Sequence, residues 1–351
     1  MNVRLAYVIA AVAAFVSTGL PAAVSGDAPP SHSSPLTPHS LDHPVRRSQP
    51  LLGTFVTITA FGANREQVSD AITAAFDEVT RVDALMSLHR ADSELTRLNS
   101  RAAESPVPAS PPLFAVIETA QRIATETDGA FDITVRPLTE LWGFIWKEYR
   151  LPTTNELART LPLVGHGLLQ LDPPQRLVRF RRAGMSLDLG GIAKGFAVDR
   201  AIERLRTLGV TNAMVKAGGD LRVSGLPPGA DHWEVQLENP QKSGRRAFIR
   251  LRSGALSTSG NYENYFEING RRYAHIVNPR TGLPVEGVAS CTVLAPTCME
   301  SDAWATALVV LGPDESLRRF GARFAIRFVL HPARRDAPWA FVRSKGFPQE
   351  N

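Results

Sequence analysis

The stretch SLDLGGIAKGFAVDRA, from Ser186 to Ala201, carries the densest signal in the sequence. It predicts a short strand that ends at Asp188, a Gly-Gly turn, and a helix that opens near Ala193 and stops at Gly209. It has neither the G-x-G-x-x-G spacing of a Rossmann fold nor the G-x-x-x-x-G-K-[ST] pattern of a P-loop. Backbone N–H groups at the helix start and the adjacent Lys194 would suit a phosphate. An ordinary strand-to-helix turn is the alternative.

Periodic patterns on either side of this stretch predict the other elements. Alternating polar and apolar residues indicate strands, and apolar residues three and four apart indicate helices. The elements expected before the glycine turn are a strand at Thr54–Thr59, helices at Glu66–Met86 and Leu113–Glu126, a helical stretch within 150–165, and a hairpin of Leu177–Arg181 with Met185–Leu189. Those expected after it are a helix at Ala193–Leu208, strands at Asn212–Lys216, Leu221–Val223, Trp233–Leu237, Arg246–Leu251, Ala255–Thr258, Tyr262–Ile268, Arg271–Ile276 and Cys291–Leu294, a helix at Asp302–Leu311, and a strand at Phe324–Leu330.

The order of these elements indicates the fold class. Helices and strands do not strictly alternate, and several strands follow one another as hairpins. We therefore expect an α+β fold with a largely antiparallel sheet and packed helices, and not a doubly wound Rossmann sheet.

The composition narrows the class of protein. The chain has 351 residues, 44% of them hydrophobic, with 39 Lys+Arg against 34 Asp+Glu and two cysteines. The apolar content excludes wholesale disorder, and two cysteines exclude a disulfide scaffold or a multi-cysteine metal cluster. The net charge of +5 is spread along the chain and aromatic residues make up 7%, so we expect no nucleic-acid partner.

The N-terminus predicts export from the cytoplasm. Arg4 precedes an apolar stretch from Leu5 to Val16 and a run of small residues, which together resemble a cleaved signal peptide over residues 1–26. An uncleaved membrane anchor is the alternative, but the stretch is shorter than the roughly 20 apolar residues of a full span. We expect a periplasmic protein.

The remaining chain divides into two parts. Residues 27–50 are rich in Pro, Ser and His and predict a linker, and residues 51–345 predict one folded unit. Outside the cytoplasm, Cys291 and Cys298 would either form a local disulfide or remain free thiols.

Three side chains are candidates for chemistry. His275 lies at a strand end beside a turn, where a general base is often placed, although a structural histidine is the alternative. Asp302 and Thr306 are four residues apart, so both project from one face of a helix. Their oxygens would suit Mg²⁺, while Asp302 could instead cap the helix.

Two further stretches are interpreted locally as structural. AGGDLRVSG, from Ala217 to Gly225, predicts a glycine turn between strands. STSGNYENYF, from Ser257 to Phe266, predicts a hairpin, with the lining of a ring-binding cleft as the alternative.

Taken in order, the motifs resemble the ApbE family of FAD:protein FMN transferases. The resemblance covers roughly Leu51 to Gly312. It is carried by LGTF (Leu52–Phe55), MSLHRADSELTRLN (Met86–Asn99), GAFDITVRPL (Gly129–Leu138), LDLGGIAKGFAVD (Leu187–Asp199), AGGD (Ala217–Asp220), STSGNYENYF, HIVNPRTG (His275–Gly282) and SDAWATALVVLG (Ser301–Gly312).

The resemblance implies an α+β fold and an activity. Such enzymes move the FMN half of FAD onto a Thr or Ser hydroxyl of an acceptor protein, release AMP and use Mg²⁺. It implies metal ligands at the side chains of Asp302 and Thr306 and at the backbone carbonyl of Gly191. The position of Ala305 is acidic in some members, so alanine would leave that ligand to water or a carbonyl.

The resemblance also implies the contacts to FAD and the base. The base near the acceptor hydroxyl would be His275. Leu52 and His89 stand where methionine and tyrosine are common, and both would still pack on the flavin or the adenine. The FAD contacts would be Leu52, His89, Ala130, Phe131, Asp132, Asp188, Lys194 and Ile276.

Two other functions stay open at this point. One is a Mg²⁺-dependent FAD pyrophosphatase that uses water as the acceptor and yields FMN and AMP. The other is a non-catalytic periplasmic flavin-binding protein. For the transferase, the partner would be an acceptor protein, typically an exported or membrane subunit of an electron-transfer complex, with peripheral or anchored association at the inner membrane.

Overall fold

The computed structural model describes residues 43–238, 247–332 and 338–350. Its centre is an eight-stranded sheet in the order β1-β2-β6-β7-β10-β13-β14-β15, in which every neighbouring pair is antiparallel. The strands are β1 (Val45–Leu51), β2 (Thr54–Phe61), β6 (Asn212–Ala217), β7 (Asp220–Ser224), β10 (Gly254–Gly260), β13 (Val288–Ala295), β14 (Ala325–Leu330) and β15 (Ala340–Arg343).

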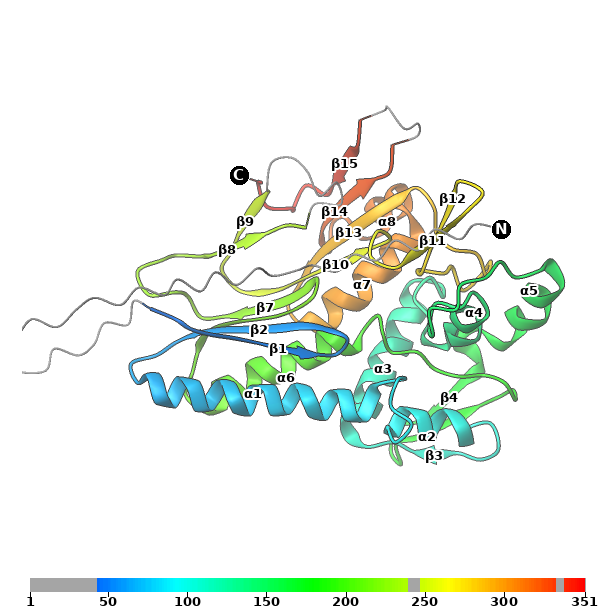
Figure 1. Cartoon of the computed structure of the whole chain (residues 1–351), viewed down its shortest axis with the longest axis horizontal. Helices are drawn as coiled ribbons and strands as arrows, with labels where there is room; N and C mark the ends of the chain where they lie inside the picture. The colour runs from blue at the N-terminus through cyan, green and yellow to red at the C-terminus, as the bar shows by residue number, and fades with distance from the viewer. Residues whose placement is uncertain (1–42, 239–246, 333–337, 351) are drawn as a thin grey trace, which may run out of the picture.

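Helices α1 (Arg65–Met86) and α6 (Ala193–Thr207) lie side by side along one face of this sheet (Figure 1). Helix α7 (Cys298–Leu311) packs against α6, β10 and β13. The apolar residues of α1 recur at three and four positions, and they are buried in the main core between helices and sheet. The core thereby fixes α6 and α7 against the middle strands.

Smaller elements complete this face and the edges of the molecule. They are α2 (Glu94–Arg101), α3 (Pro111–Glu126), α4 (Arg136–Leu141), α5 (Thr154–Thr160), α8 (Pro313–Phe320), the 3-10 turns η1 (Ile133–Val135), η2 (Leu161–Leu163) and η3 (His166–Leu168), and a sheet of β3 (Val107–Pro108), β5 (Leu177–Phe180) and β4 (Leu169–Asp172). The hairpin of β8 (Trp233–Gln236) and β9 (Phe248–Leu251) packs on the other face of the central sheet through a second, smaller core.

A third core is aromatic and supports the loop after His275. The hairpin of β11 (Tyr265–Ile268) and β12 (Arg271–Ala274) contributes Phe266 and Tyr273, whose rings stack with centroids 5.2 Å apart. The Trp142 ring stacks on Tyr273, and its Nε1–H donates to the carbonyl of Gly282 at 2.8 Å. The aromatic core therefore anchors the turn that follows His275.

The predicted boundary between linker and folded unit is wrong. The linker expected over residues 27–50 ends earlier, because Val45–Leu51 forms β1 at the edge of the sheet. Proline has no N–H group to donate, and it is tolerated at position 50 because no strand pairs with the outer side of an edge strand. Residues 1–26, the predicted signal peptide, lie outside the described residues. Among the helices that the structure describes, none is both long and apolar enough to cross a membrane.

The predicted hairpin of Leu177–Arg181 with Met185–Leu189 is also wrong. Strand β5 pairs with β3 and β4 instead. The backbone of Leu187 exchanges two hydrogen bonds with the Asn99 side chain, at 2.7 and 3.0 Å, and the N–H of Asp188 donates to the carbonyl of Ile133. The segment before the glycine turn is thus held by a side chain and a 3-10 turn, not by a strand.

Candidate active site

Helices α6 and α7 cross at close range beneath the glycine turn. A Cβ atom on Gly195 would lie 2.2 Å from the carbonyl oxygen of Cys298, so only glycine permits this approach. The N–H of Gly195 donates to Oδ2 of Asp302 at 3.0 Å. The crossing therefore aims a carboxylate of α7 at the start of α6.

Asp302 does not cap its helix. The N-cap of α7 is Thr297, whose side chain accepts from the N–H of Glu300, and Asp302 lies inside the helix and is 2% exposed. Burial, together with the neighbouring carboxylate of Asp220, raises the pKa of Asp302 to about 7. The capping alternative is therefore wrong, and the carboxylate faces the start of α6 and the small cavity instead.

Thr306 lies one helical turn after Asp302, and both line the same cavity. The hydroxyls of Thr306 and Ser259 are hydrogen-bonded at 3.0 Å. Gly191 comes close to this hydroxyl, because a Cβ atom on Gly191 would lie 3.2 Å from Thr306 Oγ1. The three residues predicted as metal ligands are thus brought together from α7 and the glycine turn.

Lys194, in the first turn of α6, is shared between two buried carboxylates. Its Nζ is 2.8 Å from Oδ2 of Asp220 and 3.5 Å from both carboxylate oxygens of Asp302. Burial opposes the charge of this ammonium, but the two carboxylates outweigh it and raise the pKa of Lys194. The ammonium remains charged, as an anion site requires.

His275 follows β12 and is half-buried. Its Nδ1 lies 3.2 Å from the carbonyl oxygen of Asn264. A carbonyl only accepts hydrogen bonds, so Nδ1 carries the proton and Nε2 of the neutral ring keeps its lone pair. Burial, with a smaller contribution from the Lys194 charge, lowers the pKa of His275 to about 4. The ring is therefore a neutral acceptor near pH 7.

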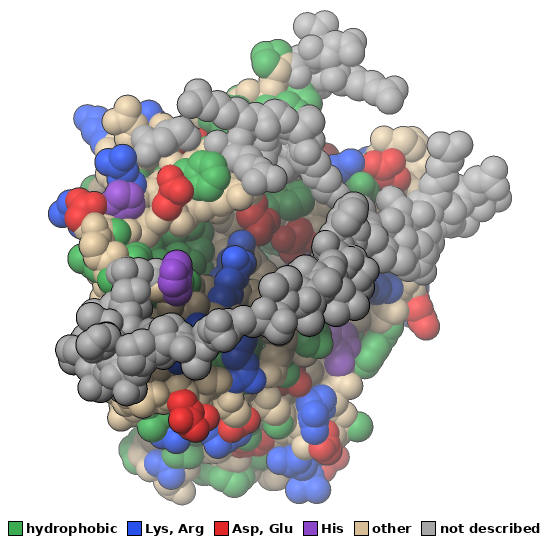
Figure 2. Space-filling view, turned by 60° about the vertical axis from the view of Figure 1, so that its left-hand side comes forward, with side chains coloured by type: hydrophobic (Ala, Val, Ile, Leu, Met, Phe, Trp, Pro, Cys, Tyr) green, Lys and Arg blue, Asp and Glu red, His purple; other side chains and the backbone are tan. Residues whose placement is uncertain are grey.

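Two adjoining cavities contain the predicted site residues. The small cavity, of about 250 Å³, is lined by Ala130, Phe131, Asp132, Asp188, Gly191, Lys194, His275, Ile276, Asp302 and Thr306, among others. The large cavity, of about 1090 Å³, is lined by Leu52 and His89. Both are lined by Thr139, Asp188, Gly190, Lys194 and His275, so they adjoin along these side chains. Figure 2 shows the molecule hollowed on one face, with acidic, basic and histidine side chains gathered in and around the hollow.

The predicted residues of the large cavity come from two turns. Leu52 has φ +55° in the two-residue turn between β1 and β2, a conformation that a leucine seldom adopts. The ring of His89 meets that of Trp146 edge to face, with centroids 5.6 Å apart. Trp146 is half-exposed, and Phe55, which lines this cavity, is exposed. The large cavity is therefore bordered by apolar and aromatic side chains.

The small cavity carries more negative than positive groups. Against the single ammonium of Lys194, its lining includes the carboxyl groups of Asp132, Asp188, Asp220, Glu263 and Asp302. Burial raises the pKa of four of them, which are Asp132, Asp188, Glu263 and Asp302. Two already serve local structure, because Asp132 accepts from Thr134 and Asp188 accepts from the N–H of Gly190. An anionic ligand would need an added cation to enter this cavity.

The donor set fits Mg²⁺. A carboxylate, a hydroxyl and a carbonyl are the hard oxygen ligands that this ion prefers. Within the described residues, no group of three or more His, Cys, Asp or Glu side chains is arranged to hold a metal, so carbonyl, hydroxyl and water ligands would be required. Ala305 is buried in the main core and does not line the small cavity.

Asp220, Ser259 and Glu263 are among the residues of the small cavity that the sequence does not predict as site residues. Asp220 follows a glycine turn that was interpreted as structural, and Ser259 and Glu263 belong to a stretch interpreted as a hairpin. Each stands next to a predicted strand end, which is the signal that would have marked them. Cys291 and Cys298 are buried free thiols, so the alternative of a disulfide is not realised.

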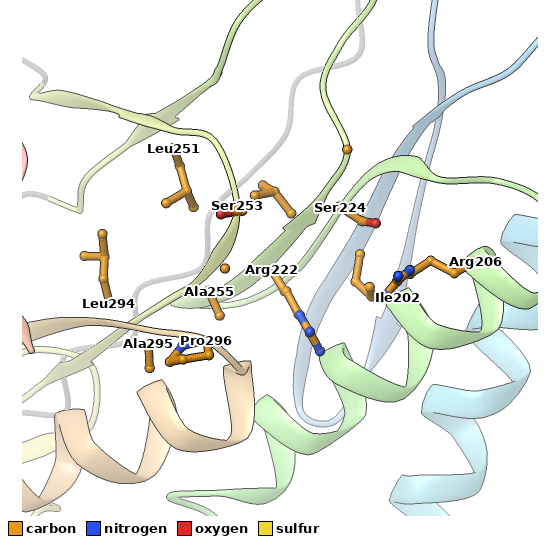
Figure 3. Close-up of a pocket in the computed structure, with 13 residues that line it drawn as sticks. Ile202, Arg206, Arg222, Ser224, Leu251, Ser253, Ala255, Leu294, Ala295 and Pro296 are labelled. Atoms are coloured by element: carbon orange, nitrogen blue, oxygen red, sulfur yellow. The ribbon is translucent and has the colours of Figure 1, made fainter.

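A third cavity, the Arg222 groove of about 640 Å³, lies between α6, β7 and β10. Figure 3 shows Arg222 pointing from β7 toward α6. Its guanidinium is 2.7 Å from Oδ1 of Asp199, and Asp199 also accepts from the N–H groups of Cys298 and Met299 at the start of α7. The ion pair of Arg222 and Asp199 thus joins α6, β7 and α7 beside this groove.

Comparison with known proteins gives a consistent result. A family model described as the ApbE family matches residues 52–326. The FAD:protein FMN transferase of Haemophilus influenzae is 37% identical over 264 residues, which cover 73% of this chain and 75% of that protein. The Salmonella typhimurium protein of the same name is 30% identical over 315 residues, covering 84% and 87%.

Solved structures agree with the sequence comparison. The crystal structure of the ApbE protein from Thermotoga maritima superposes with a TM-score of 0.77 at 32% identity and covers 86% of this chain and 97% of its own. The flavin transferase ApbE from Vibrio cholerae gives 0.76 at 30% identity, covering 87% and 98%. The predicted α+β fold and the resemblance drawn from the motifs are confirmed.

Proposed function

Because this chain belongs to the ApbE family, we propose that it is an FAD:protein FMN transferase. It would move the FMN half of FAD onto a Thr or Ser hydroxyl of an acceptor protein and release AMP, with Mg²⁺ assisting. The observation that carries the proposal is the meeting of four groups in one small cavity. They are the neutral imidazole of His275, the ammonium of Lys194, the carboxylate of Asp302 and the hydroxyl of Thr306.

The chemistry is a phosphoryl transfer. The acceptor oxygen forms a bond to the phosphorus of the FMN half, and the bond from that phosphorus to the bridging oxygen of the pyrophosphate breaks. AMP leaves with the bridging oxygen. The hydroxyl proton passes to Nε2 of His275, because a hydroxyl is a poor nucleophile until a base removes its proton. Positioning and charge neutralisation dominate such reactions.

Lys194 would balance the negative charge of the pyrophosphate. Its ammonium stands in the first turn of α6 beside the glycine turn, where backbone N–H groups also favour an anion. Since the rest of the small cavity is carboxylate-rich, this residue is the positive group that its lining supplies. Removing it should weaken FAD binding more than binding of a neutral flavin.

Mg²⁺ would supply Lewis-acid stabilisation of the pyrophosphate oxygens when bound. The chain would hold it through Asp302, Thr306 and the carbonyl of Gly191. The hydrogen bonds from Gly195 to Asp302 and between Ser259 and Thr306 orient two of these ligands before the ion arrives.

The large cavity would take one end of the dinucleotide. Its lining of Leu52 and His89 suits a planar ring, which packs on apolar and aromatic side chains. Because it adjoins the small cavity at Asp188, Lys194 and His275, a single extended ligand can occupy both.

We also propose that the enzyme acts in the periplasm. The support is the signal-peptide pattern of residues 1–26, with an uncleaved anchor as the less favoured alternative. The acceptor would then be an exported or membrane-bound electron-transfer subunit with a Thr or Ser flavinylation site, and the enzyme would meet it at the inner membrane.

The test uses the cell from which the chain comes. The gene is deleted, and membrane and periplasmic proteins are separated by denaturing gel electrophoresis and viewed by flavin fluorescence. At least one covalently fluorescent band should disappear, return with the wild-type chain, and stay absent with an Asp302→Asn variant. Unchanged bands in the deletion strain would overturn the proposal. Purified enzyme, FAD and the recovered acceptor should then react only with Mg²⁺, and reaction in excess chelator would overturn the metal assignment.

A further inference from the structure

The tip of the β6–β7 hairpin presses against β10. Gly218 has φ +58°, which favours glycine, and a Cβ atom on Gly219 would lie 2.7 Å from the carbonyl oxygen of Thr258. The carbonyl of Gly219 accepts from the N–H of Thr258 at 3.0 Å. The two glycines therefore reverse the chain and also fix the position of the residue that follows them against β10.

That residue is Asp220, which is 2% exposed. It pairs with Ala217 on β6 and with Ser257 on β10, so its backbone is fixed on both sides within the central sheet. A carboxylate on such a rigid strand has little freedom to move, and its position is a property of the fold rather than of a loop.

The ammonium of Lys194 is shared unequally. Its Nζ is 2.8 Å from Asp220, 3.4 Å from the carbonyl oxygen of Gly190, and 3.5 Å from both oxygens of Asp302. Hydrogen bonds of this type normally measure about 2.7–3.2 Å, so only the bond to Asp220 is short. Asp220 takes the strong interaction with the ammonium, and the short hydrogen bond to Asp302 comes from the N–H of Gly195 instead, at 3.0 Å from Oδ2.

We propose that Asp220 is a positioning residue that holds the Lys194 ammonium away from Asp302 and so keeps the Asp302 carboxylate available to the divalent cation of the reaction. The inference rests on the proposed function. Its physical basis is that a partly buried ammonium between two buried carboxylates keeps a close carboxylate partner. Without the charge of Asp220, Lys194 would turn to Asp302 and occupy the ligand that the cation requires.

A second explanation gives the same single-variant result. The negative charge of Asp220 could attract the cation directly, without any part for Lys194. The two explanations separate in a double-mutant cycle, because only the positioning role depends on the presence of Lys194.

The experiment titrates Mg²⁺ by isothermal calorimetry into the full folded unit, with and without FAD. The variants are Asp220→Asn, Lys194→Met and the double variant, with Asp70→Asn as a matched control on the exposed face of α1. Asp220→Asn should weaken Mg²⁺ binding about tenfold or more. In the Lys194→Met background, the same change should weaken it less than about threefold. Thermal unfolding checks that each variant is folded.

Each outcome decides the inference. Unchanged Mg²⁺ affinity in folded Asp220→Asn overturns it, and so does an equal loss in both backgrounds, which would assign Asp220 a direct electrostatic role. If Asp220→Asn does not fold, Lys194→Met alone decides, because it should bind Mg²⁺ at least as tightly as wild type and weaker binding overturns the inference. If the wild type transfers FMN but the variants give one of these overturning results, only this inference is rejected and the proposed function is retained. A wild type that neither binds Mg²⁺ nor transfers FMN overturns both.

Discussion

Helix α6 and strand β7 are joined by two ion pairs of opposite polarity. At the start of α6, Lys194 pairs with Asp220 of β7 at 2.8 Å, and in the middle of the helix, Asp199 pairs with Arg222 of β7 at 2.7 Å. The first pair lies beside a further buried carboxylate, Asp302, so its charges do not balance. In the second, Asp199 also accepts two N–H groups of α7, so its acceptor oxygens are satisfied.

The difference separates a functional site from a structural joint. Residues of both pairs line cavities, and the Arg222 groove is larger than the small cavity but smaller than the adjoining large cavity. The presence of a cavity therefore does not by itself mark the site. Unbalanced buried charge and an imidazole with a free acceptor do, because such groups are costly to keep unless they act on a ligand. Substitutions at the catalytic cavity and at the Asp199–Arg222 pair should therefore differ in their effects.

The largest effect is expected at His275. His275→Ala removes the base, and the rate of FMN transfer should fall by about 100- to 10,000-fold with little change in thermal stability. Rates are measured with saturating FAD and Mg²⁺. The control is His232→Ala, because His232 pairs with exposed Asp231 and lines neither the small nor the large cavity. If the His275→Ala enzyme is as fast as the wild type, His275 is not the base of the reaction.

At the Asp199–Arg222 pair, Asp199→Ala should mainly lower stability. It leaves the Arg222 guanidinium and two backbone N–H groups of α7 without their acceptor. Breaking such a partly buried pair should lower the free energy of unfolding by about 3 kcal/mol. Urea unfolding measures it, with Asp70→Ala on α1 as a control for the loss of an exposed aspartate. If both variants unfold at the same urea concentration, Asp199 does not join α6, β7 and α7 as described.

The lowered pKa of His275 predicts a dependence of stability on pH. The folded ring titrates at about 4 and an unfolded histidine near 6.5. Between these values the unfolded state binds the proton and the folded state does not. The contribution of this group to the free energy of unfolding is therefore fully present above about pH 6.5 and is lost as the pH falls toward 4. The loss is at most about 1.4 kcal/mol per pH unit. Urea unfolding from pH 7 to pH 5 should show wild type losing more stability than His275→Gln. Parallel curves would contradict the assigned pKa.

The smallest effect is expected in the Arg222 groove. Arg206 is exposed there, and its guanidinium lies 3.8 Å from the exposed carboxylate of Glu203. Arg206→Ala should change the free energy of unfolding by less than about 0.5 kcal/mol and leave FMN transfer unaltered. Loss of FMN transfer in this variant would show that the Arg222 groove takes part in function, which would contradict its purely structural role.

Much of the fold and the site could be predicted because both repeat simple patterns. The spacing of Val68, Ile72 and Phe76 predicts α1, and the four-residue spacing of Asp302 and Thr306 predicts their common face. Strand β1 was missed because its edge position allows Arg46, Arg47 and Pro50, which do not resemble a buried strand.

What remained unpredictable depends on contacts between distant segments. The segment before the glycine turn is held by the Asn99 side chain, which no periodicity reveals. Asp220 follows two glycines and was interpreted as part of a turn, since its partner Lys194 lies far away in the sequence. The two ion pairs between α6 and β7 become visible only once β7 is placed beside the helix.

The most direct test of the central claim is the stoichiometry of the products. The acceptor identified by its lost fluorescent band is incubated with the enzyme, FAD and Mg²⁺. Intact-mass spectrometry measures the modified acceptor, and chromatography measures AMP and free FMN. The account predicts one AMP for each acceptor that gains an FMN phosphoester on Thr or Ser, with little free FMN. AMP and free FMN in equal amounts beside an unmodified acceptor would contradict it and identify a pyrophosphatase.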